Sequence, residues 1–370
     1  MDSHRFGTIV VGGELSAFTA AAVTARSGQK VAMVAAGPGS FVLGSGILTE
    51  REVNQANINR NFPEALDEAI AFFREIADAS GCPFEGELTG ARLLPTILGD
   101  LERIAFAPGP LWNTEPRSAC PTAIVGVKEL SCFDENFMAE RLNEQARRQG
   151  VSQAYEPLHI SLAHAFGGPI TTTRIATRFD RDPEFRSELL SALFPLSAGF
   201  KRMLVPAMLG LHTSTYQLAL FEKELGCTLG ELPTLPPSIS GLRLFHRLRC
   251  YLREIGVELF EGFQVASLAI QNQLCTKVMV AGPGCPLILH GESVVLAGQN
   301  SSELLRDQST RLDEQMRPLS SAGSVIGLNL FDAASHPGDH PEGGGNAIQI
   351  HAGYSAAIAA VATRGHYAAQ

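Results

Sequence analysis

The first forty residues constrain the fold most, because their pattern predicts a strand, a turn, a helix and a second strand in succession. Residues 8–11 are a short, mostly β-branched run that is typical of a buried parallel strand, and Gly12 and Gly13 follow as a tight turn. The Ala-rich residues 16–26 predict a helix that ends at Gly28, and residues 31–34 predict the next strand. Such a unit predicts a Rossmann-type parallel sheet, in which the helix N-terminus offers N–H groups to an anion.

The end of the chain supplies the pieces that would complete such a domain. Residues 293–298 predict a buried strand that ends in Gly298, and Gly343, Gly344 and Gly345 precede an Ala-rich helix over residues 346–363. This order is that of glutathione-reductase-like flavoproteins. We therefore expect an α/β fold, with a Rossmann-type flavin-binding domain built from residues 1–50 and 233–370. Residues 8–11 and 293–297 should then share one sheet.

The middle of the chain has a different texture. Its apolar pattern predicts helices over residues 63–80, 134–150 and 189–220, the last broken at Pro195 and Pro206, and a strand over residues 123–130. We interpret residues 51–232 as an inserted α+β domain. It would serve as a cap over a small-molecule substrate or as a docking surface for a partner.

Composition excludes several classes of protein. Hydrophobic residues make up 45% of the chain and charged residues only 18%, which excludes a disordered chain or a coiled coil. The formal net charge is −9, from 29 Lys and Arg against 38 Asp and Glu. Nucleic acid and anionic membrane surfaces attract basic proteins, so neither is an expected partner.

Cysteine spacing and hydropathy bear on metals and location. The seven cysteines are scattered, and none are spaced as in zinc or iron–sulfur motifs, so we interpret them as reduced, buried thiols of a cytoplasmic protein. His336, Asp339, His340 and Glu342 have metal-compatible side chains, but the run is typical of a solvated loop and no metal is predicted. The uncharged residues 31–48 contain glycines and a proline that a membrane-spanning helix tolerates poorly, so no membrane span is expected.

Glu14 departs from the dinucleotide-binding pattern. In the fingerprint Gly-x-Gly-x-x-Gly/Ala the second glycine lets the backbone touch the pyrophosphate, but here that position is Glu14. The acidic residue that binds a ribose at the end of the second strand is also missing, because Ala35 and Ala36 stand there. A carboxylate at Glu14 would repel a diphosphate, or it could bond the free N–H groups of the helix start. FAD or NAD is therefore less expected than a monophosphate flavin or no cofactor.

Other residues are weaker candidates. Ser45 and Ser324 could donate hydrogen bonds to a flavin, and Arg243 could bind an anionic substrate, although a cluster of arginines on a helix is more often a solvated face. Arg174 and Arg178 could also meet an anion, with a surface role favoured. No Ser-His-Asp triad, Cys–His pair or P-loop is present in the sequence. A hydrolase or a kinase is therefore not predicted.

Several segments together resemble a known family, the B subunit of anaerobic glycerol-3-phosphate dehydrogenase. They are residues 10–13 (VVGG), 44–48 (GSGIL), 232–238 (LPTLPPS), 241–244 (GLRL), 322–327 (AGSVIG) and 342–345 (EGGG). The stretch from Pro236 to Leu244 is the most specific of these, and residues 51–232 match only loosely.

The resemblance implies an oxidoreductase subunit with FMN, or alternatively FAD or no cofactor. It implies a larger FAD-containing catalytic subunit and a membrane-associated iron–sulfur subunit as partners. Together these would oxidise sn-glycerol 3-phosphate to dihydroxyacetone phosphate and reduce quinone at the inner face of the cell membrane. A cofactor-free structural subunit and a stand-alone FAD oxidoreductase with another substrate remain alternatives. The predicted cofactor-binding residues are Gly12, Gly13, Glu14, Ser16, Ala17, Ser45, Gly46, Gly298, Gly323, Ser324, Gly343, Gly344 and Gly345.

Overall fold

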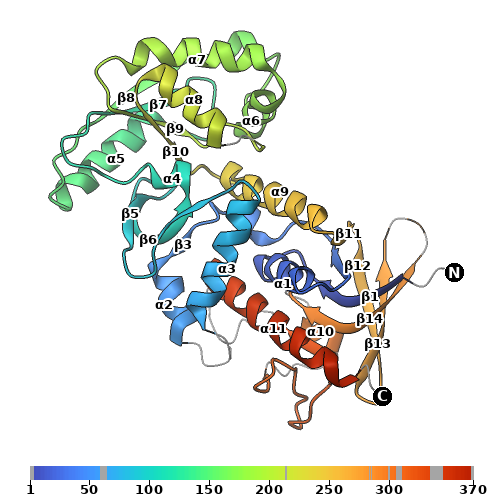
Figure 1. Ribbon diagram of the computed structural model, residues 1–370. Coiled ribbons are helices and arrows are strands. Elements are labelled where there is room, and N and C mark those ends of the chain that lie inside the picture. The colour runs from blue at the N-terminus through green and yellow to red at the C-terminus, as the bar shows by residue number, and fades with distance from the viewer. Residues whose placement is uncertain are drawn as a thin grey trace. The chain divides into compact units, whose positions relative to one another are not determined.

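The chain divides into two compact units in the computed structural model (Figure 1). The structure describes residues 4–58, 65–212, 215–282, 284, 286–298, 301–305, 311–333 and 345–367. Unit 1 comprises Met1–Phe41, Arg51–Ile76 and Leu248–Gln370, and unit 2 comprises Val42–Glu50 and Ala77–Arg247. This division differs from the predicted boundaries, because residues 51–76 belong to unit 1 and residues 42–50 and 233–247 to unit 2.

The helix α3 (Leu66–Ala79) shows why residues 51–76 join unit 1. Its Phe72 ring lies 5.6 Å from the ring of Tyr354, and its Glu75 accepts a 2.6 Å hydrogen bond from Arg26. The sequence reveals where composition changes, whereas a compact unit is defined by contacts such as these. The helix α2 (Glu50–Ile58) precedes it in the chain.

Unit 1 is built on a seven-stranded sheet in the order β11-β2-β1-β14-β13-β12, with β15 also paired to β14. The strands are β1 (His4–Val11), β2 (Val31–Ala35), β11 (Glu258–Glu261), β12 (Gln264–Gln271), β13 (Leu274–Ala281), β14 (Leu287–Leu296) and β15 (Leu330–Asp332). Strands β11, β2, β1, β14 and β15 pair in parallel, and β12 and β13 are antiparallel.

The predicted pairing of the two ends of the chain is confirmed. Thr8 lies opposite Ser293 and Val11 opposite Leu296, in parallel register between β1 and β14. The side chains of Ile9, Val34 and Val294 are fully or almost fully buried, as expected for strands covered on both faces. The α/β fold class with a Rossmann-type sheet is therefore confirmed.

Two helices pack side by side in unit 1: α1 (Leu15–Arg26) and α11 (Asn346–Tyr367) (Figure 1). Their backbones approach closely at Gly353, where a Cβ atom would lie 2.2 Å from the carbonyl oxygen of Ser16. Helix α1 ends before Gly28, whose φ of +85° is the left-handed conformation that glycine adopts readily. The short helix α10 (Ser301–Leu305) and the 3-10 turn η1 (Ser40–Leu43) complete the elements near this sheet.

Unit 2 contains two further sheets, in the orders β10-β9-β7-β8 and β3-β6-β4, with β5 paired to β6. The parallel sheet is formed by β7 (Thr122–Val127), β8 (Tyr155–Ile160), β9 (Arg202–Pro206) and β10 (Thr228–Leu232). The antiparallel sheet is formed by β3 (Leu48–Thr49), β4 (Phe84–Gly86), β5 (Arg92–Pro95) and β6 (Leu101–Pro108).

The helices of unit 2 connect these strands. They are α4 (Gly109–Trp112), α5 (Glu135–Arg148), α6 (Thr172–Arg181), α7 (Pro183–Ser197), α8 (Thr215–Leu225) and most of α9 (Ile239–Glu254), with the 3-10 turn η2 (Ala163–Ala165). The parallel sheet has the strand order of a doubly wound α/β domain, so the interpretation of this region as simply α+β is incomplete. The predicted helical run over residues 189–220 is wrong at residues 202–206, which form the central strand β9.

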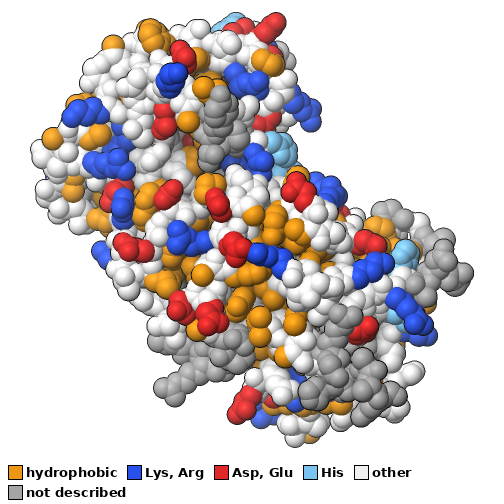
Figure 2. All heavy atoms as spheres, viewed as in Figure 1, with side chains coloured by type: hydrophobic (Ala, Val, Ile, Leu, Met, Phe, Trp, Pro, Cys, Tyr) orange, Lys and Arg blue, Asp and Glu red, His pale blue; other side chains and the backbone are white. Residues whose placement is uncertain are grey.

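The surface carries charges of both signs. On the face shown in Figure 2, Lys and Arg side chains are interspersed with Asp and Glu. Among the described residues, no helix is long and apolar enough to cross a membrane.

Candidate functional site

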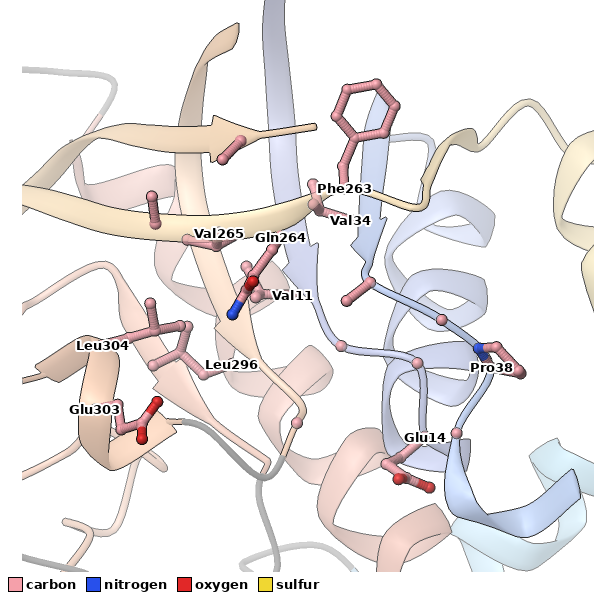
Figure 3. A pocket seen from close by; sticks show the side chains of 18 residues that line it. Val11, Glu14, Val34, Pro38, Phe263, Gln264, Val265, Leu296, Glu303 and Leu304 are labelled. Atoms are coloured by element: carbon pink, nitrogen blue, oxygen red, sulfur yellow. The ribbon is translucent and has the colours of Figure 1, made fainter. Parts of the chain in front are cut away.

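A cavity of about 490 Å³ lies in unit 1, at the carboxyl ends of the parallel strands β1, β2 and β14 (Figure 3). Ligands of open α/β sheets bind in this position, and the volume is within the range of about 300–1,000 Å³ that small-molecule sites show. The residues that line it are Val11, Gly12, Gly13, Glu14, Val34, Ala36, Gly37, Pro38, Gly39, Phe263, Gln264, Val265, Ala266, Ala281, Leu296, Gly298, Glu303 and Leu304.

The cavity combines apolar side chains with polar groups and two acids. Its walls carry valine, leucine and phenylalanine side chains, and Gln264 supplies an amide. The charged side chains among the described lining residues are Glu14 and Glu303, and no Lys, Arg or His is among them. Figure 3 shows Glu14 beside the loop that contains Pro38 and Glu303 across the space from it. The cavity is therefore suited to rings and hydroxyl groups better than to anions.

The glycine turn between β1 and α1 is required by the close packing of the backbone. Gly12 has φ +144°, and a Cβ atom there would lie 2.1 Å from the carbonyl oxygen of Ala297. A Cβ atom at Gly13 would lie 2.3 Å from the carbonyl oxygen of Gly37. Both glycines thus let three segments of this chain meet, which accounts for them without a bound pyrophosphate.

The carboxylate of Glu14 is directed at the loop after β2. Both of its oxygens accept hydrogen bonds of 2.9 Å from the backbone N–H of Ser40, and Oε2 accepts a third, of 3.0 Å, from the Ser40 hydroxyl. Glu14 is the residue that precedes α1, but its side chain makes no capping hydrogen bond to the helix. The alternative in which Glu14 bonds the free N–H groups of the helix is therefore wrong.

A different side chain meets the start of α1. The backbone N–H of Leu15 donates a 3.1 Å hydrogen bond to Oε1 of Gln349, which comes from α11 and is 6% exposed. The hydroxyl of Ser16 donates to the carbonyl oxygen of Ala297 at 3.3 Å, and Ala17 is fully buried. Of the predicted cofactor-binding residues, Ser16 and Ala17 therefore serve internal contacts and do not line the cavity.

A dinucleotide does not fit this glycine turn. The Leu15 N–H, one of the groups on which a pyrophosphate would rest, is already bonded to Gln349, and Glu14 adds a negative charge beside the turn. The ribose-binding acid at the end of β2 is absent, since Ala35 and Ala36 stand there. These features disfavour a diphosphate on this turn, whereas a flavin without the adenylate half does not need these contacts.

The other predicted residues lie in several places. Gly298 lines the cavity beside Gly12. A Cβ atom built on Gly298 would lie 3.4 Å from the Cα of Gly12. Gly323 and Ser324 form a turn closed by hydrogen bonds to Ser320 and do not line the cavity, nor does Gly345. Ser45 and Gly46 belong to unit 2. Gly343, Gly344 and the run from His336 to Glu342 lie outside the described residues.

Arg243 is a buried structural residue of unit 2. Its guanidinium donates hydrogen bonds of 2.7 and 3.1 Å to the two carboxylate oxygens of Glu231 and one of 2.9 Å to the carbonyl of Gly210. The Arg243 and Glu231 side chains are 6% and 1% exposed, respectively. A substrate would have to displace Glu231, so the geometry does not support the predicted substrate-binding role.

The two other candidate arginines also have internal partners. Arg174 donates to the carbonyl of Pro169, and Arg178 donates to Asp182 at 3.0 Å. Both guanidinium groups lie over the ring of Phe166. This favours the surface role over the binding of an anion.

Sequence reasoning missed Gln349, Ser40, Gln264 and Glu303. Gln349 is 334 residues from Leu15 in the chain, and no motif marks it. Ser40 could have been found, since it follows the Gly-Pro-Gly turn after β2 and is a common partner for a carboxylate. Among the described residues, no group of three or more His, Cys, Asp or Glu is arranged to hold a metal ion.

Comparison with known proteins identifies relatives over most of the chain. No protein-family model matches the sequence. The chain is 27% identical over 328 residues to the B subunit of anaerobic glycerol-3-phosphate dehydrogenase from Yersinia pseudotuberculosis, covering 79% of this chain and 74% of that protein. It is 20% identical to the protein of the same name from Actinobacillus pleuropneumoniae, covering 89% and 82%. The predicted resemblance is confirmed, and the prediction of an oxidoreductase subunit agrees with these names.

Solved structures show more distant likenesses. The 3-ketosteroid Δ1-dehydrogenase of Sterolibacterium denitrificans superposes with a TM-score of 0.35 and 13% identity, covering 85% of this chain and 52% of that one. The L-proline dehydrogenase of P. horikoshii gives a TM-score of 0.33 and 13% identity, covering 82% and 55%. Similarity at this level identifies no ligand and no reaction.

Proposed function

We propose that this relative of the anaerobic glycerol-3-phosphate dehydrogenase B subunits is a flavin-linked subunit of a glycerol-3-phosphate:quinone oxidoreductase. It would receive electrons from the oxidation of sn-glycerol 3-phosphate to dihydroxyacetone phosphate and pass them to a partner. The observation that carries the proposal is the cavity of about 490 Å³ at the carboxyl ends of β1, β2 and β14. Nucleotide cofactors of Rossmann-type sheets bind at this edge.

We propose FMN as the flavin. FMN has a single phosphate and no adenylate, so it does not require a pyrophosphate to rest on the N–H group that Gln349 already occupies. The apolar walls formed by Val34, Val265 and Leu296 suit a planar ring, and Gln264 suits its polar edge. FAD remains the alternative, with its diphosphate bound away from this turn.

The identity of the released flavin tests the proposal. The full chain, co-expressed with its partners, is purified, its visible spectrum is recorded, and the flavin released on denaturation is measured by mass. We expect flavin absorbance and the mass of FMN. A preparation that stays colourless after loading with excess FMN and FAD and desalting would contradict the proposal.

A cofactor-free subunit that keeps the fold to dock a catalytic chain is the second candidate. The hydrogen bonds at the glycine turn favour it. Glu14 bonds Ser40, and the Leu15 N–H bonds Gln349, without any ligand. The same spectrum distinguishes the two candidates. If the colourless chain is still needed for electron transfer by its assembly, the second candidate holds.

The partners follow from the same proposal. They would be a larger FAD-containing catalytic subunit and a membrane-associated iron–sulfur subunit, which would hold this chain at the inner face of the membrane. The roles of residues 51–232 as a substrate cap or as a docking surface remain predictions within it. Flavin content does not decide between these two roles, whereas co-purification with partners does.

A further inference from the structure

We infer that Gln349 takes the Leu15 N–H that a diphosphate would use at the glycine turn and that Glu14 places a negative charge beside it. The cavity therefore selects ligands that lack a diphosphate against their diphosphate-containing forms. This inference concerns the same cavity as the proposed function, but it stands whether or not a flavin is bound there.

The first step is the hydrogen bond at the start of α1. In dinucleotide-binding domains the N–H groups of this helix turn face the phosphates. Here the Leu15 N–H donates to Oε1 of Gln349 at 3.1 Å, so an amide oxygen stands where a phosphate oxygen would be. A ligand phosphate gains this N–H only by displacing a side chain that is 6% exposed.

The second step is the rigidity of that arrangement. Gln349 lies on α11 one turn before Gly353, and Gly353 brings the backbone of α11 against Ser16, with 2.2 Å between the carbonyl oxygen of Ser16 and the position of a Cβ atom. Gln349 therefore cannot move away from Leu15 unless its side chain rotates or the two helices separate. The packing of the two helices therefore keeps the backbone of Gln349 beside Leu15.

The third step is the charge of Glu14. Glu14 lines the cavity, and its carboxylate is held at the loop after β2 by the N–H and hydroxyl of Ser40, at 2.9 and 3.0 Å. The carboxylate therefore lies beside the turn. A phosphate next to it is repelled, and no Lys or Arg among the described lining residues offsets the repulsion.

The last step is what the cavity can hold. Glu303 and the oxygen of Gln264 can accept hydrogen bonds from ribose or ribityl hydroxyl groups, and Val11, Val34 and Leu296 offer apolar contact to a ring. A nucleoside presents a ring and hydroxyl donors without a negative charge. Adding a diphosphate contributes repulsion from Glu14 and does not gain the Leu15 N–H, which Gln349 holds.

Calorimetric titration of the full chain with adenosine, ADP, riboflavin and FAD tests this. We expect wild type to bind adenosine and riboflavin at least about tenfold more tightly than ADP and FAD, respectively, which corresponds to about 1.4 kcal/mol. Equal or tighter binding of the diphosphates, or no binding of the two nucleosides, overturns the inference.

Variants locate the effect. Gln349→Met removes the acceptor at similar volume, and Glu14→Gly removes the charge, so the double variant should gain about ten- to hundredfold in affinity for ADP while its affinity for adenosine stays within about threefold. The matched control Gln349→Glu keeps an acceptor at Leu15 and adds a charge, so it should gain nothing for ADP. If the double variant gains nothing either, the inference fails.

Hydrogen exchange supplies a readout that needs no ligand. The Leu15 amide should be protected in wild type and in Gln349→Glu, and should exchange faster in Gln349→Met than the neighbouring α1 amides do. Unchanged protection in Gln349→Met contradicts the inference. If the proposed function is wrong and this inference is right, wild type purified with its partners will contain no flavin. It will still bind the nucleosides more tightly than the diphosphates.

Discussion

At the scale of single residues, the buried ion pair between Arg243 and Glu231 organises the loop after β9. Besides the guanidinium, Glu231 Oε1 accepts hydrogen bonds from the N–H groups of Met208 and Leu209, at 3.1 and 2.9 Å. Removing one partner leaves an uncompensated buried charge, so we expect Arg243→Met to lower the free energy of unfolding by about 3–5 kcal/mol. Urea unfolding followed by circular dichroism measures this loss.

The control for this prediction removes both charges. The double variant Glu231→Leu with Arg243→Met should be less destabilised than the single Arg243→Met, because no lone charge stays buried. A double variant that is destabilised by the sum of the two single changes would show that the pair is not coupled. The single variant should also change electron-transfer activity only through stability, since the Arg243 side chain is 6% exposed and paired with Glu231.

Cys275 gives a pH-dependent prediction at the same scale. Burial raises the pKa of its thiol from the ordinary 9.0 to about 11. The unfolded chain releases this proton near pH 9 while the folded chain holds it, so the stabilising contribution is complete below pH 9 and is lost as the pH rises to about 11. The loss is about 2–3 kcal/mol from a shift of two units.

The measurement is the free energy of unfolding at several pH values between 8 and 11 for wild type and Cys275→Ala. Stability of the variant should fall less steeply in this range, although Cys82 and Cys227, whose pKa values burial also raises to about 11, still contribute. The exposed Cys250 provides the control, and Cys250→Ala should follow wild type. Parallel curves for wild type and Cys275→Ala would contradict the assignment.

At the scale of elements, the contact of α1 with α11 depends on Gly353. A methyl group there would meet the carbonyl oxygen of Ser16 at 2.2 Å and its Cα at 2.7 Å, and backbone cannot yield as a flexible side chain can. We expect Gly353→Ala to lower the free energy of unfolding by about 1–3 kcal/mol, as overpacking does, despite the better helix propensity of alanine. Gly109→Ala, at the start of α4, has nothing within 4 Å of the new methyl group and should change stability by less than about 0.5 kcal/mol. Thermal unfolding of both variants measures the two effects. A Gly353→Ala variant that is more stable than wild type would contradict the prediction.

The elements also show what the sequence can predict. The β1–α1–β2 unit was predictable because strand, glycine turn and helix are contiguous and each has a local signal. The strand β9 was missed because a short apolar run is equally compatible with helix or strand by periodicity alone. The three-residue strand β15 is defined by its pairing with β14 and has no pattern of its own.

The residues of the candidate site also divide into some that the sequence predicts and some that it does not. Gly12, Gly13, Glu14 and Gly298 were predicted to lie together, and they do line one cavity, because a motif places them at the carboxyl ends of neighbouring strands. The role of Gln349 was not predictable, since it depends on how α11 lies against α1. The partner of Glu14, in contrast, was within reach of the sequence, since Ser40 follows the Gly-Pro-Gly turn after β2.

At the scale of the whole molecule, strands from near both ends of the chain share one sheet, and residues 42–50 and 77–247 form a second unit. The parallel sheet of that unit reverses its strand order between β7 and β9, as doubly wound sheets do. The change in composition along the sequence indicated an inserted domain. The apolar patterns of the strands and helices are similar in both units, so they do not reveal where each unit begins.

The last prediction concerns the assembly. The relatives of this chain are named as the B subunit of a dehydrogenase, so we expect the purified chain to be incomplete as an enzyme. When it is co-expressed with a larger flavoprotein and a cysteine-rich chain, the three should co-purify through size-exclusion chromatography. The complete assembly should reduce quinone with sn-glycerol 3-phosphate, and an assembly prepared without this chain should do so at least about tenfold more slowly, a difference of about 1.4 kcal/mol in activation free energy. The Cys250→Ala variant, changed at an exposed thiol away from the cavity, should restore the full rate as the matched control. Robust quinone reduction by this chain alone, or an undiminished rate in its absence, would show that it is not the subunit that links substrate oxidation to the acceptor.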